Sequence, residues 1–394
     1  MSLSVSKRMA AIKPSPTGAV LALVSELRAA GRDILSLGAG EPDFDTPQHI
    51  KDAAVRAIER NETKYTPIDG TASLKAAVQH KFAHENQLDY ELSQIIVSSG
   101  AKQCLFNLCM GLLGPGDEAI IPAPYWVSYP DMVRLAGAEP VIIETGIEAN
   151  FKITPEQLAT AISDKTRLLI LNSPSNPTGA SYSKRDLQAL GAVIAEHPSI
   201  VVVADDIYEH IHWGADPFCS FATACTDLYD RTVTINGVSK AYAMTGWRIG
   251  YAAGPKELIA AMKTVQSQST SNPCSISQAA AQAALLGDQA PVARMTAAYK
   301  ERHDYVVTAL NSIEGVECRS GEGTFYAFPR VSGALESMKL ASDTDLVEHL
   351  INEADVACVP GTAFGAAGYM RLSFACSMEI LEDALNRVKR VLMG

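Results

Sequence analysis

The sequence predicts an α/β fold in which helices cover both faces of a mostly parallel sheet, together with a second, smaller α+β domain. Two observations support this prediction. Short, strongly apolar runs of strand length alternate with helical patterns through the middle of the chain, and such apolar strands are typical of a sheet buried on both faces. From about residue 290 the alternation gives way to a long helix, short strands and a last helix.

Strands and helices can be assigned along the chain. One helix should begin at Thr154 and Pro155, because threonine is a common N-cap and proline is favoured in the first turn. Ligands of such folds gather beyond the carboxyl ends of the strands, and polar motifs stand at those ends here. Strands are predicted at 94–99, 117–124, 166–172, 199–206, 231–237 and 247–254, and helices at 101–113, 183–196, 296–310 and 377–392.

The length of the chain predicts two domains. A chain of 394 residues is too long for one small core. We assign residues 45–290 to a large domain that contains the main ligand site. Residues 1–44 together with 291–394 form the smaller domain, which includes an N-terminal lid segment.

The composition argues against several function classes. Hydrophobic residues make up 47% and charged residues 20% of the chain, which is typical of a globular protein. The net charge of −11 disfavours nucleic acids and anionic membranes as partners, because both attract basic surfaces. The start of the chain lacks an apolar core of signal-peptide length, and no apolar run could span a bilayer. Eight cysteines without a Cys-x-x-Cys pair indicate reduced thiols. We therefore expect a cytoplasmic protein.

One stretch, GVSKAYAMTGWRIG at 237–250, places two cations eight residues apart. Lys240 stands among small residues. A lysine in apolar surroundings near another cation loses part of its preference for the charged form and becomes a usable nucleophile. Arg248 keeps its charge and can bind a phosphate through two parallel hydrogen bonds.

Three further motifs complement this stretch. SSGAK ends a strand and opens a helix, where backbone N–H groups bind phosphate, although alone it could be an ordinary turn. VVVADDIYEH puts Asp205 and Asp206 at the end of a buried strand, where a carboxylate needs a cation or a donor unless it only caps a helix. Tyr208 follows closely, and Trp126 offers an aromatic plate. Together with Lys240 these groups match what pyridoxal phosphate requires: a Schiff-base lysine, a partner for the ring nitrogen and a phosphate cradle.

Two other patterns are interpreted as structural. SLGAGEPDF contains Gly-x-Gly, but Asp43 replaces the third glycine of a dinucleotide motif and Pro42 interrupts the helix. A nicotinamide site is therefore rejected, while close backbone approach at Gly40 stays open. HKFAH and EHIH each contain two histidines at a spacing that could bind a metal ion. The first pair belongs to a solvated helix face, and no metal site is predicted at either.

Over nearly its whole length the chain resembles the class I (fold type I) pyridoxal-phosphate aminotransferases. The lysine signature of this family runs Gly or Ser, an apolar residue, a small residue, Lys, and then Gly-x-Arg-x-Gly, and residues 237–250 match it. The NPTG element at 176–179 is also characteristic of the family. The resemblance implies that Lys240 carries the cofactor as a Schiff base and moves a proton between the substrate and the cofactor. Many members have Ser where this chain has Gly237, so one side-chain contact to phosphate is absent.

The resemblance also implies roles for the other residues. Asp205 would keep the ring nitrogen protonated, and Tyr208 and Asn176 would bind the ring oxygen. Arg371 in MRLSFA, helped by the backbone of Gly40, would bind the α-carboxylate of the substrate, which also contacts Trp126 and Asn176. The remaining cofactor contacts would come from Gly100, Ala101, Trp126, Ser239, Arg248 and Tyr65. Because Tyr65 would reach the cofactor of the other subunit, the resemblance implies a homodimer with active sites at the interface.

Four motifs resemble the bacterial aspartate aminotransferase subgroup: GEPDFDTP, KYTP, PYWVSYPDM and AMTGWRIGYAAGP. This subgroup is thought to bind the distal carboxylate with a lysine, here Lys102, assisted by Thr17 on a mobile N-terminal lid. Lys13 resembles a position that is linked to prephenate use in some members. A dicarboxylate needs two cations, and Arg371 and Lys102 would supply them. Lys13 and Lys102 could also be ordinary surface or helix-start residues.

We therefore expect a cytoplasmic, homodimeric enzyme that moves the amino group of L-aspartate to 2-oxoglutarate by a ping-pong mechanism, giving oxaloacetate and L-glutamate. One alternative is a bifunctional aspartate/prephenate aminotransferase, or one with broader aromatic acceptance. Another is a carbon–sulfur or cyclising lyase on the same fold. The non-enzymatic alternative is a sugar- or nucleotide-binding α/β domain in which Lys240 is structural.

Overall fold

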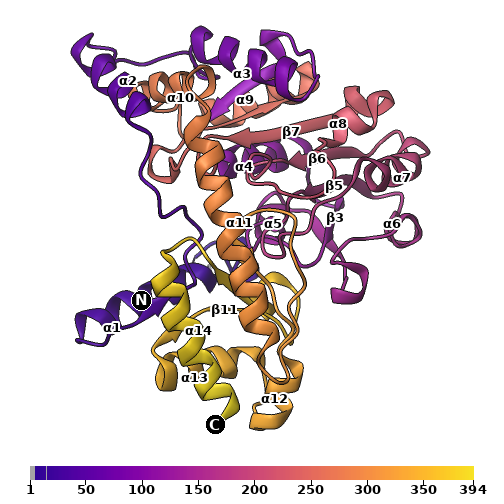
Figure 1. Ribbon diagram of the computed structural model, residues 1–394. Helices are drawn as coiled ribbons and strands as arrows, with labels where there is room; N and C mark the ends of the chain where they lie inside the picture. Colours follow the sequence, from indigo (N-terminus) through magenta and orange to yellow (C-terminus); the bar gives the residue numbers. More distant parts are fainter. Residues whose placement is uncertain (1–4, 15) are drawn as a thin grey trace.

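The computed structural model describes residues 5–14 and 16–394, and a seven-stranded sheet forms its centre (Figure 1). The strands lie in the order β2-β8-β7-β6-β5-β3-β4. Strand β8 runs antiparallel to β2 and β7, and the other neighbours are parallel. The prediction of a mostly parallel sheet is confirmed. The bounds are β2 Ile95–Ser98, β3 Glu118–Pro122, β4 Glu139–Ile143, β5 Thr166–Asn172, β6 Val201–Asp205, β7 Thr232–Gly237 and β8 Gly250–Ala253.

The strands are apolar throughout because helices cover both faces of the sheet. Side chains of a strand point alternately to its two faces. Leu168 and Ile170 of β5 therefore join the core beneath α4 (Ala101–Leu112), α5 (Tyr129–Leu135) and α9 (Lys256–Ser267). Leu169 and Leu171 join the opposite core beneath α7 (Lys184–Ala195) and α8 (Phe221–Ala224). Helix α6 (Pro155–Ala161) begins at the predicted N-cap Thr154, whose hydroxyl accepts a hydrogen bond from the Gln157 amide.

Strand β4 was not predicted from the sequence. It pairs only with β3 among the described residues, which makes it an edge strand of the sheet. Its second residue is Pro140, and proline within a strand is tolerated at edges because its missing N–H need not face a partner. The proline weakened the strand pattern of EPVII in the sequence.

A third core covers the end of the sheet that is formed by β2 and β8. The helices α2 (Gln48–Glu59), α3 (Ala72–Glu85) and α10 (Ser275–Leu286) pack there against Ile95, Val97 and Tyr251. In Figure 1 these helices lie together at the top of the molecule. The segment from 62 to 71 connects α2 to α3 and carries the exposed Tyr65.

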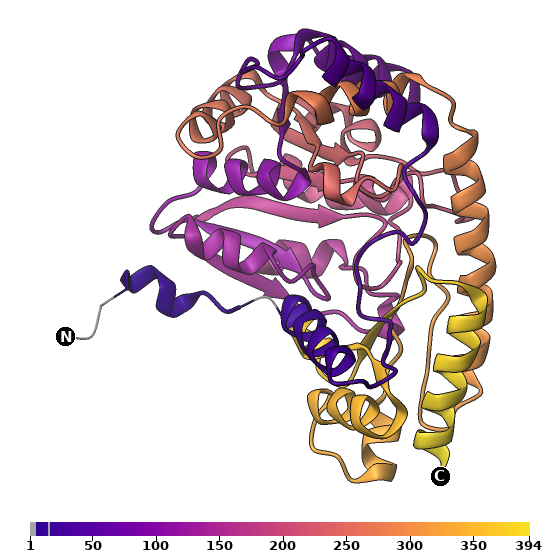
Figure 2. The ribbon, with the colours of Figure 1, turned by 90° about the vertical axis from the view of Figure 1, so that its left-hand side faces the viewer.

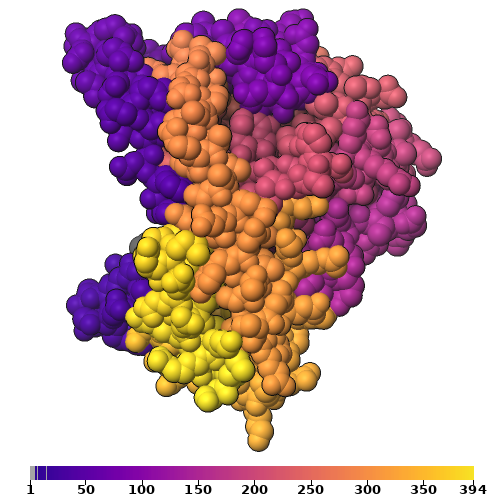
Figure 3. Space-filling model, viewed as in Figure 1, coloured from indigo at the N-terminus to yellow at the C-terminus, as the bar shows by residue number. Residues whose placement is uncertain are grey.

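The C-terminal part of the chain forms a smaller body below the sheet, and α11 (Ala290–Asn311) runs from one part to the other (Figures 1 and 3). This body also contains α1 (Pro16–Ala29), whose following strand β1 (Leu35–Ser36) pairs in parallel with β10 (Val356–Ala357). The domain limits at 44/45 and 290/291 stay a prediction. The other elements are β9 Tyr326–Ala327, β11 Val359–Pro360, β12 Met370–Ser373, α12 Ser332–Met338, α13 Asp343–Ala354 and α14 Met378–Met393.

The N-terminal segment lies against α5. Figure 2 shows the short helix η1 (Lys7–Ala11) extended to one side of α1. Among the described residues, no helix has both the length and the apolar character that a membrane span would require.

Candidate functional site

A cavity of about 370 Å³ lies where the sheet meets the smaller body, at the carboxyl ends of β5, β6 and β7. Its wall combines residues from both ends of the chain. It brings together most of the residues that the sequence singles out. From that set, the wall contains Thr17, Gly40, Ala101, Lys102, Trp126, Asn176, Asp205, Tyr208, Ser239, Lys240, Arg248 and Arg371.

Lys240, shortly after the end of β7, presents its amine inside this cavity. Its Nζ donates a hydrogen bond to the backbone oxygen of Gly40, at 2.6 Å. Burial and the neighbouring Arg371 lower the pKa of Lys240 to about 8, against the opposing effect of Glu41. The unprotonated amine, which a nucleophile or a general base requires, is therefore far more populated near neutral pH than in an ordinary lysine.

Asp205 is the last residue of β6 and is buried. The hydroxyl of Tyr129 donates to its Oδ2 at 2.6 Å, and the Asn172 side chain donates to its backbone oxygen at 2.8 Å. Burial raises the pKa of Asp205 to about 6, although the hydrogen bonds from Tyr129 and the Ile207 amide oppose this rise. The carboxylate is therefore poised to bind a cationic group in the cavity.

Arg371 on β12 is 2% exposed and is held from several sides. It donates to Asn176 Oδ1 at 3.0 Å and to the backbone oxygen of Gly38 at 2.8 Å. Its guanidinium carbon lies 4.4 Å from the ring centre of Tyr326 and 4.9 Å from that of Phe364. Its Nε is buried without a hydrogen-bond partner. A buried guanidinium with an unused donor is suited to bind a carboxylate.

An anion cradle forms where β8 passes the start of α4. A Cβ at Gly250 would lie 2.1 Å from the Ala101 nitrogen, and a Cβ at Gly100 (φ +91°) would lie 2.5 Å from the guanidinium nitrogen Nη2 of Arg248. Both positions therefore require glycine. The amides of Ala101 and Lys102 begin the helix and have no acceptor within it. They and Arg248 converge on a space that can hold an anion.

Lys102 and Trp126 form the outer wall of the cavity. The Lys102 Nζ lies 4.8 Å from the Trp126 ring centre, and burial together with Arg248 lowers the pKa of Lys102. Thr17 of α1 lines the same cavity. A second cavity of about 460 Å³ shares Lys102 and Arg248 with the first and is also lined by Lys13.

Three of the predicted site residues do not line the cavity that contains Lys240. Lys13 lines only the second cavity, and Tyr65 is 92% exposed on the surface. Gly100 lies against the guanidinium of Arg248.

The sequence interpretation missed several residues of the site. Tyr326 lies with its oxygen 3.0 Å from that of Tyr208. The Asn172 side chain accepts from the Asn176 amide at 2.8 Å, and Thr245 donates to Glu41 at 3.0 Å. Tyr129 lies three residues after Trp126 in the motif PYWVSYPDM. Its hydrogen bond to Asp205 at the end of β6 could not be predicted, because the two residues are far apart in the sequence.

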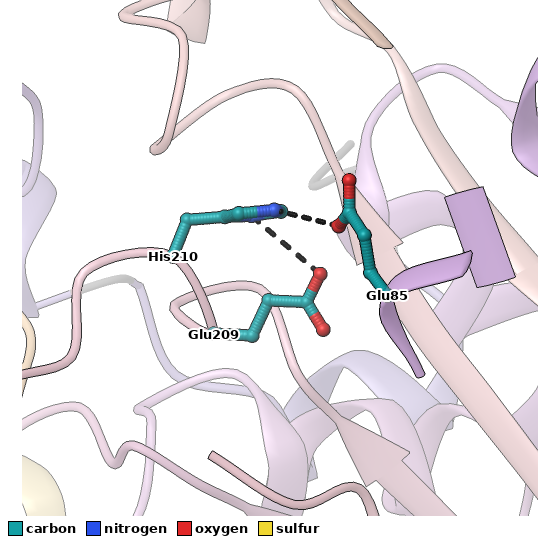
Figure 4. A group of neighbouring side chains, drawn as sticks. All are labelled: Glu85, Glu209 and His210. Carbon is teal, nitrogen blue, oxygen red and sulfur yellow. Dashed lines mark hydrogen bonds and ion pairs between the residues drawn. The ribbon is translucent and has the colours of Figure 1, made fainter. Parts of the chain in front are cut away.

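Glu85, Glu209 and His210 form a separate group outside the cavity (Figure 4). The His210 ring lies near both carboxylates, with Nε2 2.9 Å from Glu85 and Nδ1 3.5 Å from Glu209. The fully buried ammonium of Lys81 pairs with Glu209 and donates to Asn86 at 2.6 Å. Because a lysine of the chain already supplies the cation, we assign no metal role to this group.

Comparisons with known proteins agree with this geometry. The family model "Aminotransferase class I and II" matches residues 32–388. An aspartate/prephenate aminotransferase of Nitrosomonas europaea is 54% identical, over 99% of this chain and 100% of that protein. An aspartate aminotransferase of Rhizobium meliloti is 48% identical, over 97% of this chain and 94% of that protein. The crystal structure of the aspartate aminotransferase from Rhizobium meliloti superposes with a TM-score of 0.95 at 46% identity, over 100% of this chain and 99% of that one. The structure of the Thermus thermophilus aspartate aminotransferase with maleate superposes with a TM-score of 0.93 at 44% identity, over 99% of this chain and 100% of that one.

Proposed function

Because the chain belongs to the class I and II aminotransferases, we propose that it moves the amino group of L-aspartate to 2-oxoglutarate, with pyridoxal 5′-phosphate as the cofactor. One observation carries this proposal. The amine of Lys240 shares a single cavity with two separate cations, Arg371 and Lys102. A dicarboxylic amino acid would place one carboxylate on each cation.

The residues present fit pyridoxal phosphate. The cradle, whose close packing requires glycine at positions 100 and 250, would hold the phosphate with Arg248 and the first amides of α4. Asp205 would bind the ring nitrogen, with Tyr208 and Asn176 on the ring oxygen. Trp126 and Ser239 line the same space. When bound, this cofactor withdraws the electrons that remain on the substrate Cα after proton loss.

The side chains of the chain would divide the remaining work. Lys240, with its lowered pKa, would bind the cofactor covalently and then carry the proton to and from the substrate Cα. Asp205 would keep a positive charge on the ring nitrogen, because a buried carboxylate gains most from a cationic partner. Arg371 would orient the α-carboxylate through the guanidinium N–H groups that are not donated to Asn176 and Gly38. Fixing the substrate in this way replaces a bimolecular encounter by an oriented one.

Lys102 and Thr17 would bind the distal carboxylate. Both line the cavity, and the pKa of Lys102 is lowered by burial and by Arg248. A carboxylate would relieve the repulsion between these two cations, which favours acidic substrates over neutral ones.

Two further features are also proposed for this chain. Tyr65 is 92% exposed and does not line the cavity that contains Lys240. We assign it to the phosphate site of a second subunit in a homodimer. The enzyme would act on soluble amino acids and 2-oxo acids in the cytoplasm.

A second candidate function is transamination with prephenate. It is favoured by the second cavity, where Lys13 adds a cation next to Lys102 and Arg248, and by relatives named aspartate/prephenate aminotransferase. A cyclic dicarboxylate larger than 2-oxoglutarate could use this space.

The test is the absorption spectrum of the purified protein with cofactor, recorded before and after L-aspartate alone. The band of the cofactor attached to Lys240 should convert to the pyridoxamine form, and 2-oxoglutarate should restore it. Prephenate is then tried as the acceptor in place of 2-oxoglutarate. A band that aspartate leaves unchanged would refute aspartate as the substrate, and release of pyruvate and ammonia would indicate a lyase instead.

A further inference from the structure

A buried glutamine of α9, Gln266, lies behind the anion cradle. It is 0% exposed. Its Nε2 donates to the backbone oxygens of Ile68, at 2.6 Å, and Val97, at 2.9 Å. Its Oε1 accepts from the Ser98 hydroxyl at 2.5 Å and from the Asn107 side chain at 2.9 Å. A glutamine amide offers two donors and two acceptor lone pairs, so all four are used.

These contacts join the segments that build the cradle. Val97 and Ser98 end β2, and only Ser99 separates them from Gly100. Asn107 lies on α4, whose first turn supplies the amides of the cradle. Ile68 belongs to the segment that also carries Tyr65.

The turn after α9 supports the same region from a second side. The Ser99 backbone amide donates to Gln103 Oε1 at 2.7 Å, and the side-chain Nε2 of Gln103 donates to the Thr270 hydroxyl. The backbone of Gln266 begins that turn, because its oxygen accepts from the Ser271 amide at 3.0 Å. The end of α9 therefore holds both the strand end and the helix start that form the cradle.

We propose that Gln266 is a positioning residue for the phosphate site. Through Ser98, Val97 and Asn107 it holds the first amides of α4 in the orientation in which they and Arg248 bind the phosphate. An apolar side chain of the same length would leave these buried groups without partners, which costs free energy for each group. The turn would then relax to recover other partners. This inference rests on the proposed function, because it assumes that the cradle binds a phosphate.

The test compares three full-length chains without cofactor: wild type, Gln266→Met and Met262→Ala. Met262 is 0% exposed and lies one turn earlier on α9, so its truncation destabilises the same helix while the hydrogen bonds of Gln266 stay in place. The dissociation constants of inorganic phosphate, pyridoxal phosphate and pyridoxal are measured by titration, and Tm is measured beside them. The ratio of the pyridoxal constant to the pyridoxal phosphate constant isolates the contribution of the phosphate.

We expect Gln266→Met to raise the dissociation constant of phosphate about tenfold, the lower end of the range found for residues that orient the ligands of a bound metal ion. The pyridoxal ratio should fall by a similar factor. Met262→Ala should lower Tm and leave both quantities unchanged.

If Gln266→Met lowers Tm but keeps the wild-type phosphate constant and ratio, Gln266 only stabilises the fold and the proposal is wrong. If the wild-type chain binds neither phosphate nor pyridoxal phosphate, the proposed function itself fails. Should Gln266→Met not fold, Ser98→Ala removes a single hydroxyl from the same network. It should weaken phosphate binding in the same direction by a smaller factor, and an unchanged constant contradicts the proposal.

Discussion

Replacing Asp205 by Asn should stabilise the cofactor-free protein while it disables the enzyme. Burial raises the pKa of Asp205 from 3.8 to about 6. At about 1.4 kcal/mol per pKa unit, the ionised carboxylate costs about 3 kcal/mol of folding free energy. Asparagine keeps an oxygen that can accept the Tyr129 hydrogen bond, observed at 2.6 Å in the wild type, and removes the buried charge.

The pH dependence gives this prediction its sign. The folded protein binds a proton at Asp205 more tightly than the unfolded chain does, so the free energy of unfolding falls as the pH rises from about 4 to about 6. Above that window the full cost remains. The Asp205→Asn variant has no carboxylate at this position, so its free energy of unfolding does not fall in this way. At pH 7.5 its free energy of unfolding should exceed that of the wild type by about 2 to 3 kcal/mol.

Urea unfolding of the cofactor-free proteins, followed by fluorescence at pH 4.5 and 7.5, measures the effect. At the lower pH the difference between the two proteins should narrow to about 1 kcal/mol. Asp216→Asn, an exposed control, should match the wild type at both pH values. With cofactor the order reverses, because only the carboxylate gains from a cationic ring nitrogen. Transamination should fall roughly 100-fold or more, the scale of losing one aligned charge in an active site. A variant no more stable than wild type at pH 7.5 would refute the reasoning.

Four further substitutions follow from the site. Lys240→Ala should bind inorganic phosphate as wild type but lose the absorption band of the attached cofactor and all transamination; retained turnover would contradict the role of Lys240. Arg371→Lys should raise KM for every amino acid at least about tenfold, because a lysine cannot form a bidentate pair with a carboxylate; an effect on aspartate alone would oppose this. Lys102→Ala should raise KM for aspartate more than for alanine or phenylalanine, and an equal change for all three removes Lys102 from the distal site. Gly250→Ala should weaken phosphate binding, since its Cβ would lie 2.1 Å from the Ala101 nitrogen, whereas Gly246→Ala, with nothing within 4 Å, should match wild type in the same titration.

Short motifs and local periodicity were enough to predict much of this protein. The alternation of apolar strands with helices predicted the parallel sheet, because a strand that is buried on both faces is apolar at nearly every position. GVSKAYAMTGWRIG carried the lysine and the arginine of the site together, since they lie within one turn-and-strand segment. The edge strand β4 escaped because Pro140 masks its pattern.

Contacts between distant segments were decided only by the tertiary structure. Arg371 meets Asn176 across 195 residues and Gly38 across 333. Gln266 joins strand β2 to the segment of Ile68 from the end of a helix that has no motif of its own. The sequence by itself determined which chemical groups the chain possesses and which local elements carry them. The order of strands in the sheet and the packing of the C-terminal body against it decided which of those groups share one cavity, because side-chain hydrogen bonds depend on distances that no local pattern encodes.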